Sequence, residues 1–260
     1  MFVSTRILSL MNKSLFPTFA NPHAYACTGV GKRSANEDYF TEESNDYGRL
    51  LVVCDGVGGA ERGAEASKYI AEHIATAWRT NNAPWLAEEL QHEIQRAELD
   101  FRSEFSSSAT QQMGTTVVVA QWVQDQVIVA WVGDSPFYHF SENGEQVYRS
   151  KDHSMVQNLI DAGVISEKEG KVWPGRNVIT RSVSLRGEKT QADVYQAEVQ
   201  KGDVFFLATD GVLEGVDLRL FRAKIKKGRD MNEIGHWMKS CCEKFSKDNF
   251  TFHLVQNSNN

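Results

Sequence analysis

Acidic residues stand beside glycine or asparagine at five points along this 260-residue chain. The five are Glu37-Asp38, Asp55-Gly56, Gly133-Asp134, Asp210-Gly211 and Asp248-Asn249. Asp-Gly is a common turn dipeptide, so any one of these points taken alone indicates a turn. Together they indicate a site for hard divalent cations, which prefer carboxylate oxygens as ligands. We interpret the pattern as that of a two-metal phosphohydrolase.

The spacing of these residues suits hydrolysis at phosphorus. Asp55 and Asp210 each follow an apolar run and precede a glycine, which lets a backbone carbonyl approach a cation closely. Two cations that share a carboxylate can hold a water, lower its pKa and stabilise an in-line displacement. Such a site also needs a phosphate anchor. Arg33, four residues before Glu37, is the natural candidate because its guanidinium fork matches two phosphate oxygens.

Apolar periodicity predicts the elements that must position these residues. The continuous run at 50–54 predicts a strand buried on both faces, with Asp55 at its end. Apolar residues three or four apart predict helices over 67–78 and 86–105. Similar patterns predict a helix at 234–245, a first strand from Tyr25, and strands at 115–123, 126–132, 136–140, 194–199, 204–207 and 250–255.

The order of these elements predicts an α+β fold. Short strands arrive in two groups, with two helices after the second strand and one before the last, which indicates two stacked sheets covered by helices on both sides. Residues 152–184 are poor in strand signal and hold a helix-like stretch at 155–162. We therefore expect this segment to stand off the core.

Composition sets the class of protein. With 41% hydrophobic and 24% charged residues, the chain is typical of one globular domain, which we place at 23–257. A net charge of -6 gives no general attraction to nucleic acid or an anionic membrane. We expect residues 1–22 to be a disordered arm, because their apolar patch is too short to span a membrane and a signal peptide is improbable.

The four cysteines form no Cys-x-x-Cys pair. We interpret them as reduced thiols of a cytoplasmic protein. Cys54 precedes Asp55, but it lies within an apolar run and lacks the Cys-x5-Arg loop of cysteine phosphatases, so we expect it in the core.

Eight short motifs appear in the order found in the metal-dependent serine/threonine protein phosphatases of the type 2C class, in their compact bacterial form. They are Gly31-Lys32-Arg33-Ser34-Ala35-Asn36-Glu37-Asp38, Asp55-Gly56-Val57-Gly58-Gly59, Gly114-Thr115-Thr116, Gly133-Asp134-Ser135, Asp152-His153-Ser154, Asn177-Val178-Ile179-Thr180-Arg181, Thr209-Asp210-Gly211 and Asp248-Asn249-Phe250-Thr251. Each motif is weak alone, but eight in order make the resemblance strong.

The resemblance implies a four-layer α-β-β-α sandwich of two antiparallel sheets, with a flap subdomain at about 152–184. It also implies a centre of two Mn²⁺ or Mg²⁺ ions in the cleft at one end, and a weaker third ion. The metal ligands would be Asp55 as the bridge, Glu37 and the Gly56 carbonyl for one ion, Asp210 and Asp248 for the other, and Asp134 with Asp210 for the third. Arg33 would hold the substrate phosphate, and Asp38 would orient the attacking water.

The chain departs from the family pattern at several positions. Val57 follows Gly56, where eukaryotic relatives carry a histidine proposed as general acid, so no general acid is assigned. Pro136 follows Ser135 where an arginine is common, and it removes a cation and a backbone donor near Asp134. Ser184 stands close to the flap hinge, where glycine is usual. His153 is expected to fix the base of the flap.

The function implied is hydrolysis of phosphoserine and phosphothreonine monoesters in proteins, with no phosphoenzyme intermediate. The partners would be a phosphorylated protein substrate and a cognate Ser/Thr kinase, with no nucleic acid and no membrane. The alternative is a pseudophosphatase that binds phosphopeptides without turnover. Within the enzyme class, an anti-sigma antagonist and a kinase that controls a secretion system are both open as the pathway.

Overall fold

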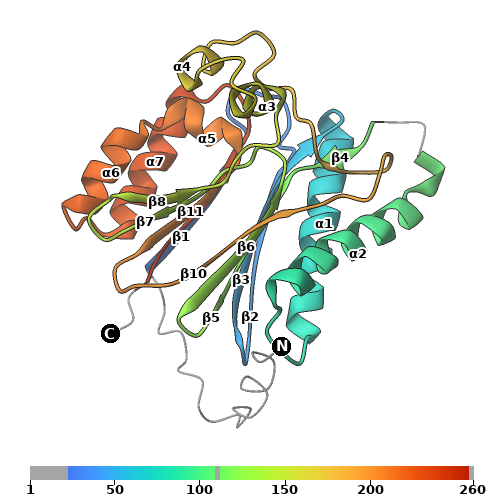
Figure 1. Cartoon of the computed structure of the whole chain (residues 1–260), viewed down its shortest axis with the longest axis horizontal. Coiled ribbons are helices and arrows are strands. Elements are labelled where there is room, and N and C mark those ends of the chain that lie inside the picture. The colour runs from blue at the N-terminus through green and yellow to red at the C-terminus, as the bar shows by residue number, and fades with distance from the viewer. Residues whose placement is uncertain (1–22, 109–111, 258–260) are drawn as a thin grey trace.

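The computed structural model describes residues 23–108 and 112–257. Two antiparallel sheets stack face to face, and helices cover the outer face of each sheet, so the layers run α-β-β-α (Figure 1). This confirms the expected fold. The expectation of a disordered arm concerns residues 1–22, which lie outside the described residues. None of the described helices is long and apolar enough to cross a membrane.

Sheet A has five strands. They lie in the order β1, β12, β11, β7 and β8, with bounds His23–Gly29, Phe250–Gln256, Val204–Ala208, Phe137–Phe140 and Gln146–Arg149. Every neighbouring pair is antiparallel. The first and last described strands are therefore side by side, and β12 lies between β1 and β11.

Sheet B has seven strands. Its path is β10, β6, β5, β3, β4 and β9, with bounds Asp193–Glu198, Gln126–Val132, Val117–Val123, Gly48–Val57, Gly114–Thr115 and Val183–Ser184. The seventh strand, β2 at Asp38–Asn45, pairs with β3. Strand β3 is the longest, and it is flanked along its length by β2 on one side and by β5 and then β4 on the other.

Helices bury an apolar stripe against each sheet. The pair α1 (Ala60–Thr80) and α2 (Ala87–Glu104) covers sheet B, while α5 (Asp210–Gly215), α6 (Leu218–Lys226) and α7 (Met231–Phe245) cover sheet A. On α2, Leu90, Ile94, Ala97 and Phe101 are fully buried at helical spacing. Each large apolar side chain buried in this way contributes roughly 1.5–3 kcal/mol of transfer free energy. A third apolar cluster fills the space between the two sheets.

The structure corrects two details of the strands. Strand β3 continues to Val57, so Asp55 lies inside the strand rather than at its end. The reason is that β2 and β4 supply partners on both sides as far as this point. The run at 115–123 is also divided into β4 and β5, because Thr116 leaves the ladder to bond to Asp55. Strand β2 itself was not expected, since its sequence is mostly polar.

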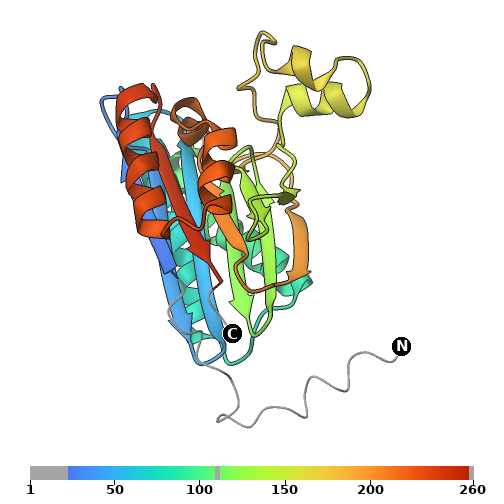
Figure 2. The ribbon, with the colours of Figure 1, turned by 90° about the vertical axis from the view of Figure 1, so that its left-hand side faces the viewer.

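The segment 152–184 stands away from the sheets (Figure 2). It contains α3 (Met155–Asp161), close to the helix expected there, and a short α4 (Glu167–Gly170). Ser184 is part of β9 and pairs with Gly114 of β4, so the last residues of the segment belong to sheet B rather than to a free hinge.

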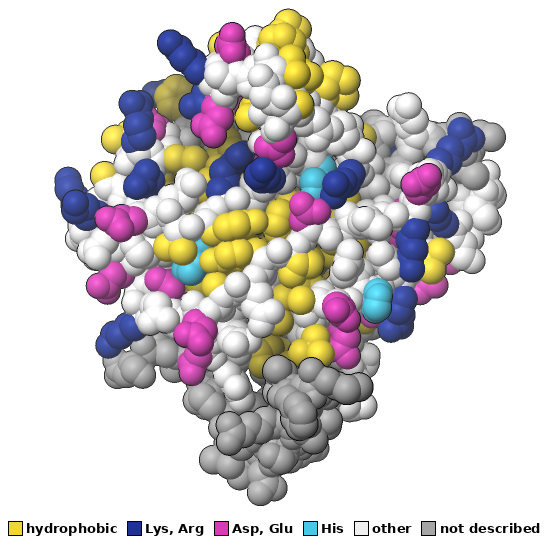
Figure 3. Space-filling view, in the orientation of Figure 1, with side chains coloured by type: hydrophobic (Ala, Val, Ile, Leu, Met, Phe, Trp, Pro, Cys, Tyr) yellow, Lys and Arg dark blue, Asp and Glu magenta, His cyan; other side chains and the backbone are white. Residues whose placement is uncertain are grey.

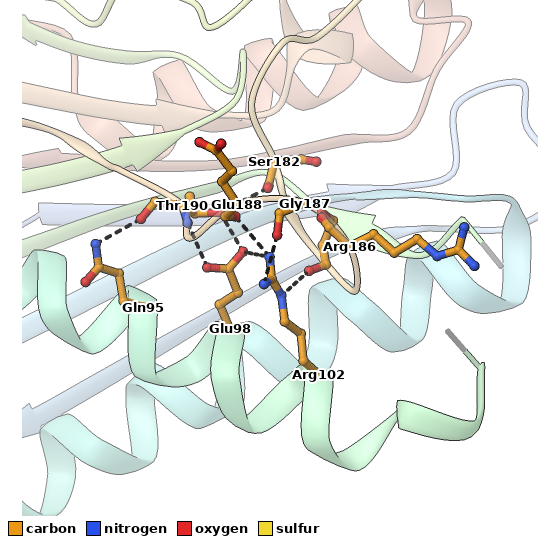
Figure 4. Close-up of polar contacts among 9 residues, drawn as sticks. Gln95, Glu98, Arg102, Ser182, Arg186, Gly187, Glu188 and Thr190 are labelled. Carbon is orange, nitrogen blue, oxygen red and sulfur yellow. Dashed lines mark hydrogen bonds and ion pairs between the residues drawn. The ribbon is translucent and has the colours of Figure 1, made fainter. Parts of the chain in front are cut away.

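Two residues of α2 hold the chain that follows this segment (Figure 4). Arg102 donates hydrogen bonds to the backbone carbonyls of Ser184, Gly187 and Glu188. Glu98, fully buried, pairs with Arg102 at 2.8 Å and accepts from the backbone N–H and the hydroxyl of Thr190. Because Ser184 pairs with Gly114, this cluster connects α2 to the strand next to β3.

Glu98→Ala is expected to lower the free energy of unfolding by about 3 kcal/mol, because Arg102 and the Thr190 N–H lose a buried charged acceptor. Urea unfolding followed by circular dichroism measures the change. The exposed Glu88, at the start of the same helix, provides the control Glu88→Ala. If the two variants unfold at the same urea concentration, Glu98 does not hold the loop.

Candidate functional site

Acidic side chains from both sheets meet at one end of the sandwich. Asp38 opens β2 directly opposite Asp55 on β3. Asp210 is the first residue of α5 and is separated from β11 by Thr209 alone, and Asp248 lies two residues before β12. Asp134 lies in the turn between β6 and β7. The negative charges of the other four aspartates all raise the pKa of Asp55, so these five acids lie together.

The electrostatic cost of this arrangement is visible in the pKa values. Burial, together with the charges of neighbouring aspartates, raises the pKa of Asp38 to about 7 and that of Asp210 to about 6. Burial and the charges of Asp210 and Asp152 raise the pKa of Asp134 to about 7. Asp55 is half-buried, and loss of water contact, together with the charges of Asp38 and Asp210, raises its pKa well above the usual range. These carboxylates therefore lack sufficient positive charge from the protein itself.

One carboxylate oxygen of Asp38 accepts a hydrogen bond, and the other has no partner among the described residues. The Thr209 hydroxyl donates to Asp38 Oδ2 at 2.8 Å, and Thr209 Oγ1 in turn accepts from the backbone N–H of Thr251. Asp38 Oδ1 is buried and has no hydrogen-bond partner among the described residues. Native structures satisfy nearly all buried polar atoms, so this oxygen marks a place where a ligand or water belongs.

The backbone of Asp55 is fixed by two threonines. Its N–H donates to Thr116 Oγ1 at 3.0 Å, and its carbonyl accepts from Thr116 N–H and from Thr115 Oγ1, both at 2.8 Å. Thr116 Oγ1 also lies 2.6 Å from the hydroxyl of Ser135, next to Asp134. Thr116 thus ties two of the acids together. The sequence offered this residue only as part of the Gly-Thr-Thr motif.

Arg33 lies at the edge of the site and is about half exposed. Its guanidinium Nη2 donates to Asp248 Oδ2 at 2.6 Å, so the predicted phosphate anchor is paired with a predicted metal ligand. Burial raises the pKa of Glu37, while the charge of Arg33 opposes that shift. The loop that carries Arg33 therefore already supplies one positive charge to the acids.

Asn249 holds this loop in place, a role that the sequence did not reveal. Its side-chain amide donates to the carbonyls of Val30 and Ala35, and its Oδ1 accepts from Glu37 N–H. Gly31 completes the fit: it has φ +62°, and a Cβ there would lie 2.0 Å from the carbonyl oxygen of Asp248. The signal for Asn249 was its place directly after Asp248.

Gly56 and Gly63 allow β3 and the first turns of α1 to approach closely around Glu37. A Cβ on Gly56 would lie 2.2 Å from the Gly63 carbonyl oxygen, and one on Gly63 would lie 2.0 Å from Glu37 Oε2. The Gly56 N–H also donates to the Glu37 carbonyl at 3.1 Å. Glu37 is thereby placed against the strand that carries Asp55. Gly63 is a further residue that sequence reasoning missed.

His153 joins the base of the projecting segment to the site. Its Nδ1 accepts from Gly133 N–H at 3.0 Å, and its backbone N–H donates to the Gly133 carbonyl at 2.9 Å. Gly133 directly precedes Asp134, so His153 fixes the turn that carries this acid. The arrangement agrees with the structural role expected for His153.

The donor set suits hard divalent cations rather than soft ones, because its members are carboxylate and carbonyl oxygens. Among the described residues, no three His, Cys, Asp or Glu side chains converge closely enough to hold one ion by themselves. Mg²⁺ commonly takes only one or two carboxylates and retains several waters, so the arrangement remains compatible with such ions. The raised carboxyl pKa values and the unpartnered Asp38 Oδ1 both indicate a missing positive charge or ligand.

Comparison with known proteins identifies the family. The family model for protein phosphatase 2C matches residues 30–234. The serine/threonine phosphatase Stp of Listeria innocua is 29% identical over 242 residues, which cover 90% of this chain and 95% of that protein. This chain belongs to the protein phosphatase 2C family.

Solved structures agree with this assignment. The serine/threonine phosphatase Stp1 of Staphylococcus aureus has a TM-score of 0.82 at 27% identity, covering 91% of this chain and 95% of that one. The catalytic domain of the phosphatase PstP, solved in complex with two manganese ions, has a TM-score of 0.76 at 22% identity, covering 91% and 98% of the two chains. The arrangement of the two sheets is therefore that of the family.

Asp38→Asn is expected to stabilise the protein in the presence of a chelator. A carboxyl group whose pKa is higher in the folded protein binds more protons when folded, so the free energy of unfolding falls as pH rises from about 4 through about 7. Removing one such charge should raise the stability at pH 8 by on the order of 2 kcal/mol, or Tm by roughly 4–8 °C.

Thermal unfolding at pH 4 and pH 8, with chelator present, measures this effect. The difference between Asp38→Asn and the wild type should shrink at pH 4, where the carboxyl group is protonated in the folded protein and about half protonated in the unfolded chain. Asp125→Asn, at an exposed turn, serves as the control. An Asp38→Asn variant that is less stable than the wild type at pH 8 would contradict the repulsion described above.

Proposed function

We propose that this chain, a serine/threonine protein phosphatase by its family, hydrolyses phosphoserine and phosphothreonine monoesters at a centre of two divalent cations. The observation that carries this proposal is the group of partly buried acids from both sheets, because their loss of water contact and their mutual repulsion raise the pKa of Asp55 and its neighbours. The two manganese ions of the PstP catalytic domain support the same number of ions here. Mn²⁺ or Mg²⁺ would suit the oxygen ligands.

The residues proposed to hold the ions are those that the family resemblance indicates. Asp55 would be shared by both, Glu37 and the Gly56 carbonyl would complete one set, and Asp210 with Asp248 the other. Bound divalent cations would lower the pKa of water and neutralise charge that develops on the phosphoryl oxygens. Asp134, beside Asp210, is the candidate for a weaker third position, and its turn is held by His153.

The other residues of the site bind and orient. Asp38 would orient the attacking water and accept its proton at Oδ1, the oxygen left without a partner among the described residues. Arg33 would bind the substrate phosphate with donors other than the Nη2 that contacts Asp248. Thr209 and Thr116 would keep Asp38 and Asp55 in position during the reaction.

The pathway and location are further parts of the proposal. The substrate would be a phosphorylated protein, opposed by a cognate Ser/Thr kinase. Four free cysteines suit the reducing conditions of the cytoplasm. All acids assigned to the site are present, and no observation favours the pseudophosphatase alternative.

Purified protein is expected to hydrolyse p-nitrophenyl phosphate and a phosphothreonine peptide with Mn²⁺ or Mg²⁺, and to lose this activity in chelator. Asp55→Asn should abolish turnover, at least about a thousandfold, because its charge would be shared by both cations. Circular dichroism checks that the variant is folded. Near wild-type activity of Asp55→Asn would show that the assignment of the cation centre is wrong.

Arg33→Ala is expected chiefly to raise the KM for p-nitrophenyl phosphate, by roughly tenfold, because its proposed role is ground-state binding of phosphate. Arg33→Lys should recover part of the affinity, since a lysine keeps the charge but loses the fork. Steady-state kinetics at saturating Mn²⁺ separate KM from kcat. An unchanged KM in Arg33→Ala would remove Arg33 from the phosphate site.

A further inference from the structure

A hollow lies away from the acids, between α6 and α7 on the outer side of sheet A. Its volume is about 310 Å³, and it is lined by Leu220, Ala223, Lys224, Lys227, Arg229 and Trp237. This volume is near the lower limit for small-molecule pockets, so it has room for one or two side chains rather than for a large ligand. No part of the proposed phosphatase mechanism uses it.

Helix α6 presents one continuous stripe to this hollow. Leu220, Ala223, Lys224 and Lys227 are spaced at i, i+3, i+4 and i+7, which places them on one face of a helix. The opposite side of α6 buries Phe221 and Ile225 against sheet A. The stripe is therefore a second face of the helix, and the core does not require it.

The stripe is apolar at one end and cationic at the other. Leu220 is 56% exposed, and it borders the hollow beside Ala223 and Trp237, so its apolar surface is continuous with the lining of the hollow. Lys224 Nζ lies 4.7 Å from the centre of the Trp237 ring. Trp237 belongs partly to the apolar cluster beneath, which keeps the indole in place. Tryptophan, in a pocket beside cations, is a common anchor of protein interfaces.

The surroundings of the hollow are basic although the whole chain is acidic. Residues 217–230 contain six lysines and arginines and two aspartates, whereas the chain has a net charge of -6. Neither Lys224 nor Lys227 has a carboxylate partner in the described part of the chain. Figure 3 shows both dark-blue and magenta side chains along the left edge, where α6 lies in Figure 1, so the basic character belongs to the residues of the hollow rather than to the whole edge. The local field therefore attracts acidic groups.

We infer that the groove between α6 and α7 binds an acidic segment of the phosphoprotein substrate that carries one apolar side chain. The apolar side chain would lie between Leu220 and Trp237, and neighbouring carboxylates would contact Lys224 and Lys227. Arg229 is already paired with Glu233 at 3.0 Å, so it is not assigned to the partner. A protein segment suits the groove better than nucleic acid or an anionic membrane, because its centre is an apolar pocket and the net charge of the chain is negative.

The groove is close to the proposed site in sequence, because α6 begins at Leu218, soon after α5, which starts at Asp210. A substrate long enough to span the groove and the site would present its phosphorylated residue at a raised effective concentration. This inference rests on the proposed function, and it names the feature by which the phosphatase would select its substrates.

Binding is tested with a fluorescein-labelled, unphosphorylated peptide in which glutamates surround a single phenylalanine, measured by fluorescence anisotropy. Leu220→Asp should weaken binding by roughly ten- to thirtyfold, as loss of a central interface contact does. Leu99→Asp is the matched control, since Leu99 on α2 is 52% exposed and far from the groove. Equal binding by the two variants would overturn the inference.

Charge is tested separately with two adjacent lysines. Lys227→Glu should weaken binding of the acidic peptide more than Lys226→Glu does, because Lys227 lines the hollow and Lys226 does not. Both changes place the same charge at the end of α6. An equal effect of the two would indicate only a general field and would contradict a defined groove. Tighter binding of a single-stranded oligonucleotide or of anionic vesicles at the same residues would also overturn it.

Catalysis provides the final readout. A phosphothreonine peptide extended by the acidic-apolar segment should have a lower KM than the unextended peptide, and Leu220→Asp should remove this difference while leaving p-nitrophenyl phosphate hydrolysis unchanged. Failure of the proposed function would appear as no hydrolysis of any substrate. Failure of the groove alone would appear as full activity with identical KM values for both peptides.

Discussion

The gathering of carboxylates in a partly buried site is the constraint on which the rest of the structure depends. Asp38 is buried, and Asp55, Asp134 and Asp210 are half-buried at one end of the sandwich. Loss of water contact is the main reason that their pKa values rise, and repulsion between the carboxylates adds to it. The packing of two sheets and their helices must supply enough free energy to hold them there. The site therefore attracts cations. Arg33 is the positive side chain that the protein places beside these acids, and it offsets only part of their negative charge.

Uncharged groups do most of the positioning. Thr209, Thr116 and Asn249 bind the acids or the loops beside them, and none of these side chains changes the net charge of the site. A lysine or arginine in their place would neutralise the acids permanently and compete with a cation. Threonine and asparagine fix geometry while leaving the electrostatic field available for a ligand.

Much of the fold could be predicted from apolar periodicity. The apolar run of β3 and the apolar stripe of α2 each show which residues of one element are buried, so each can be recognised without knowing its partners. The grouping of the acids also followed, from their recurrence beside glycine. The edge strand β2 did not, since its pairing with β3 rather than its own polar sequence makes it a strand. The roles of Gly63 and Asn249 depend on contacts with residues distant in the chain, which local patterns do not encode.

The contacts of Arg102 have a consequence for how this phosphatase can change over time. Arg102 binds the carbonyls of Ser184, Gly187 and Glu188, which every amino acid possesses. Substitutions in this loop that preserve its backbone conformation leave those hydrogen bonds intact, so these three positions can tolerate different side chains. The return of the projecting segment to sheet B therefore depends largely on backbone groups, and the side chain of Thr190, which donates to Glu98, is the exception.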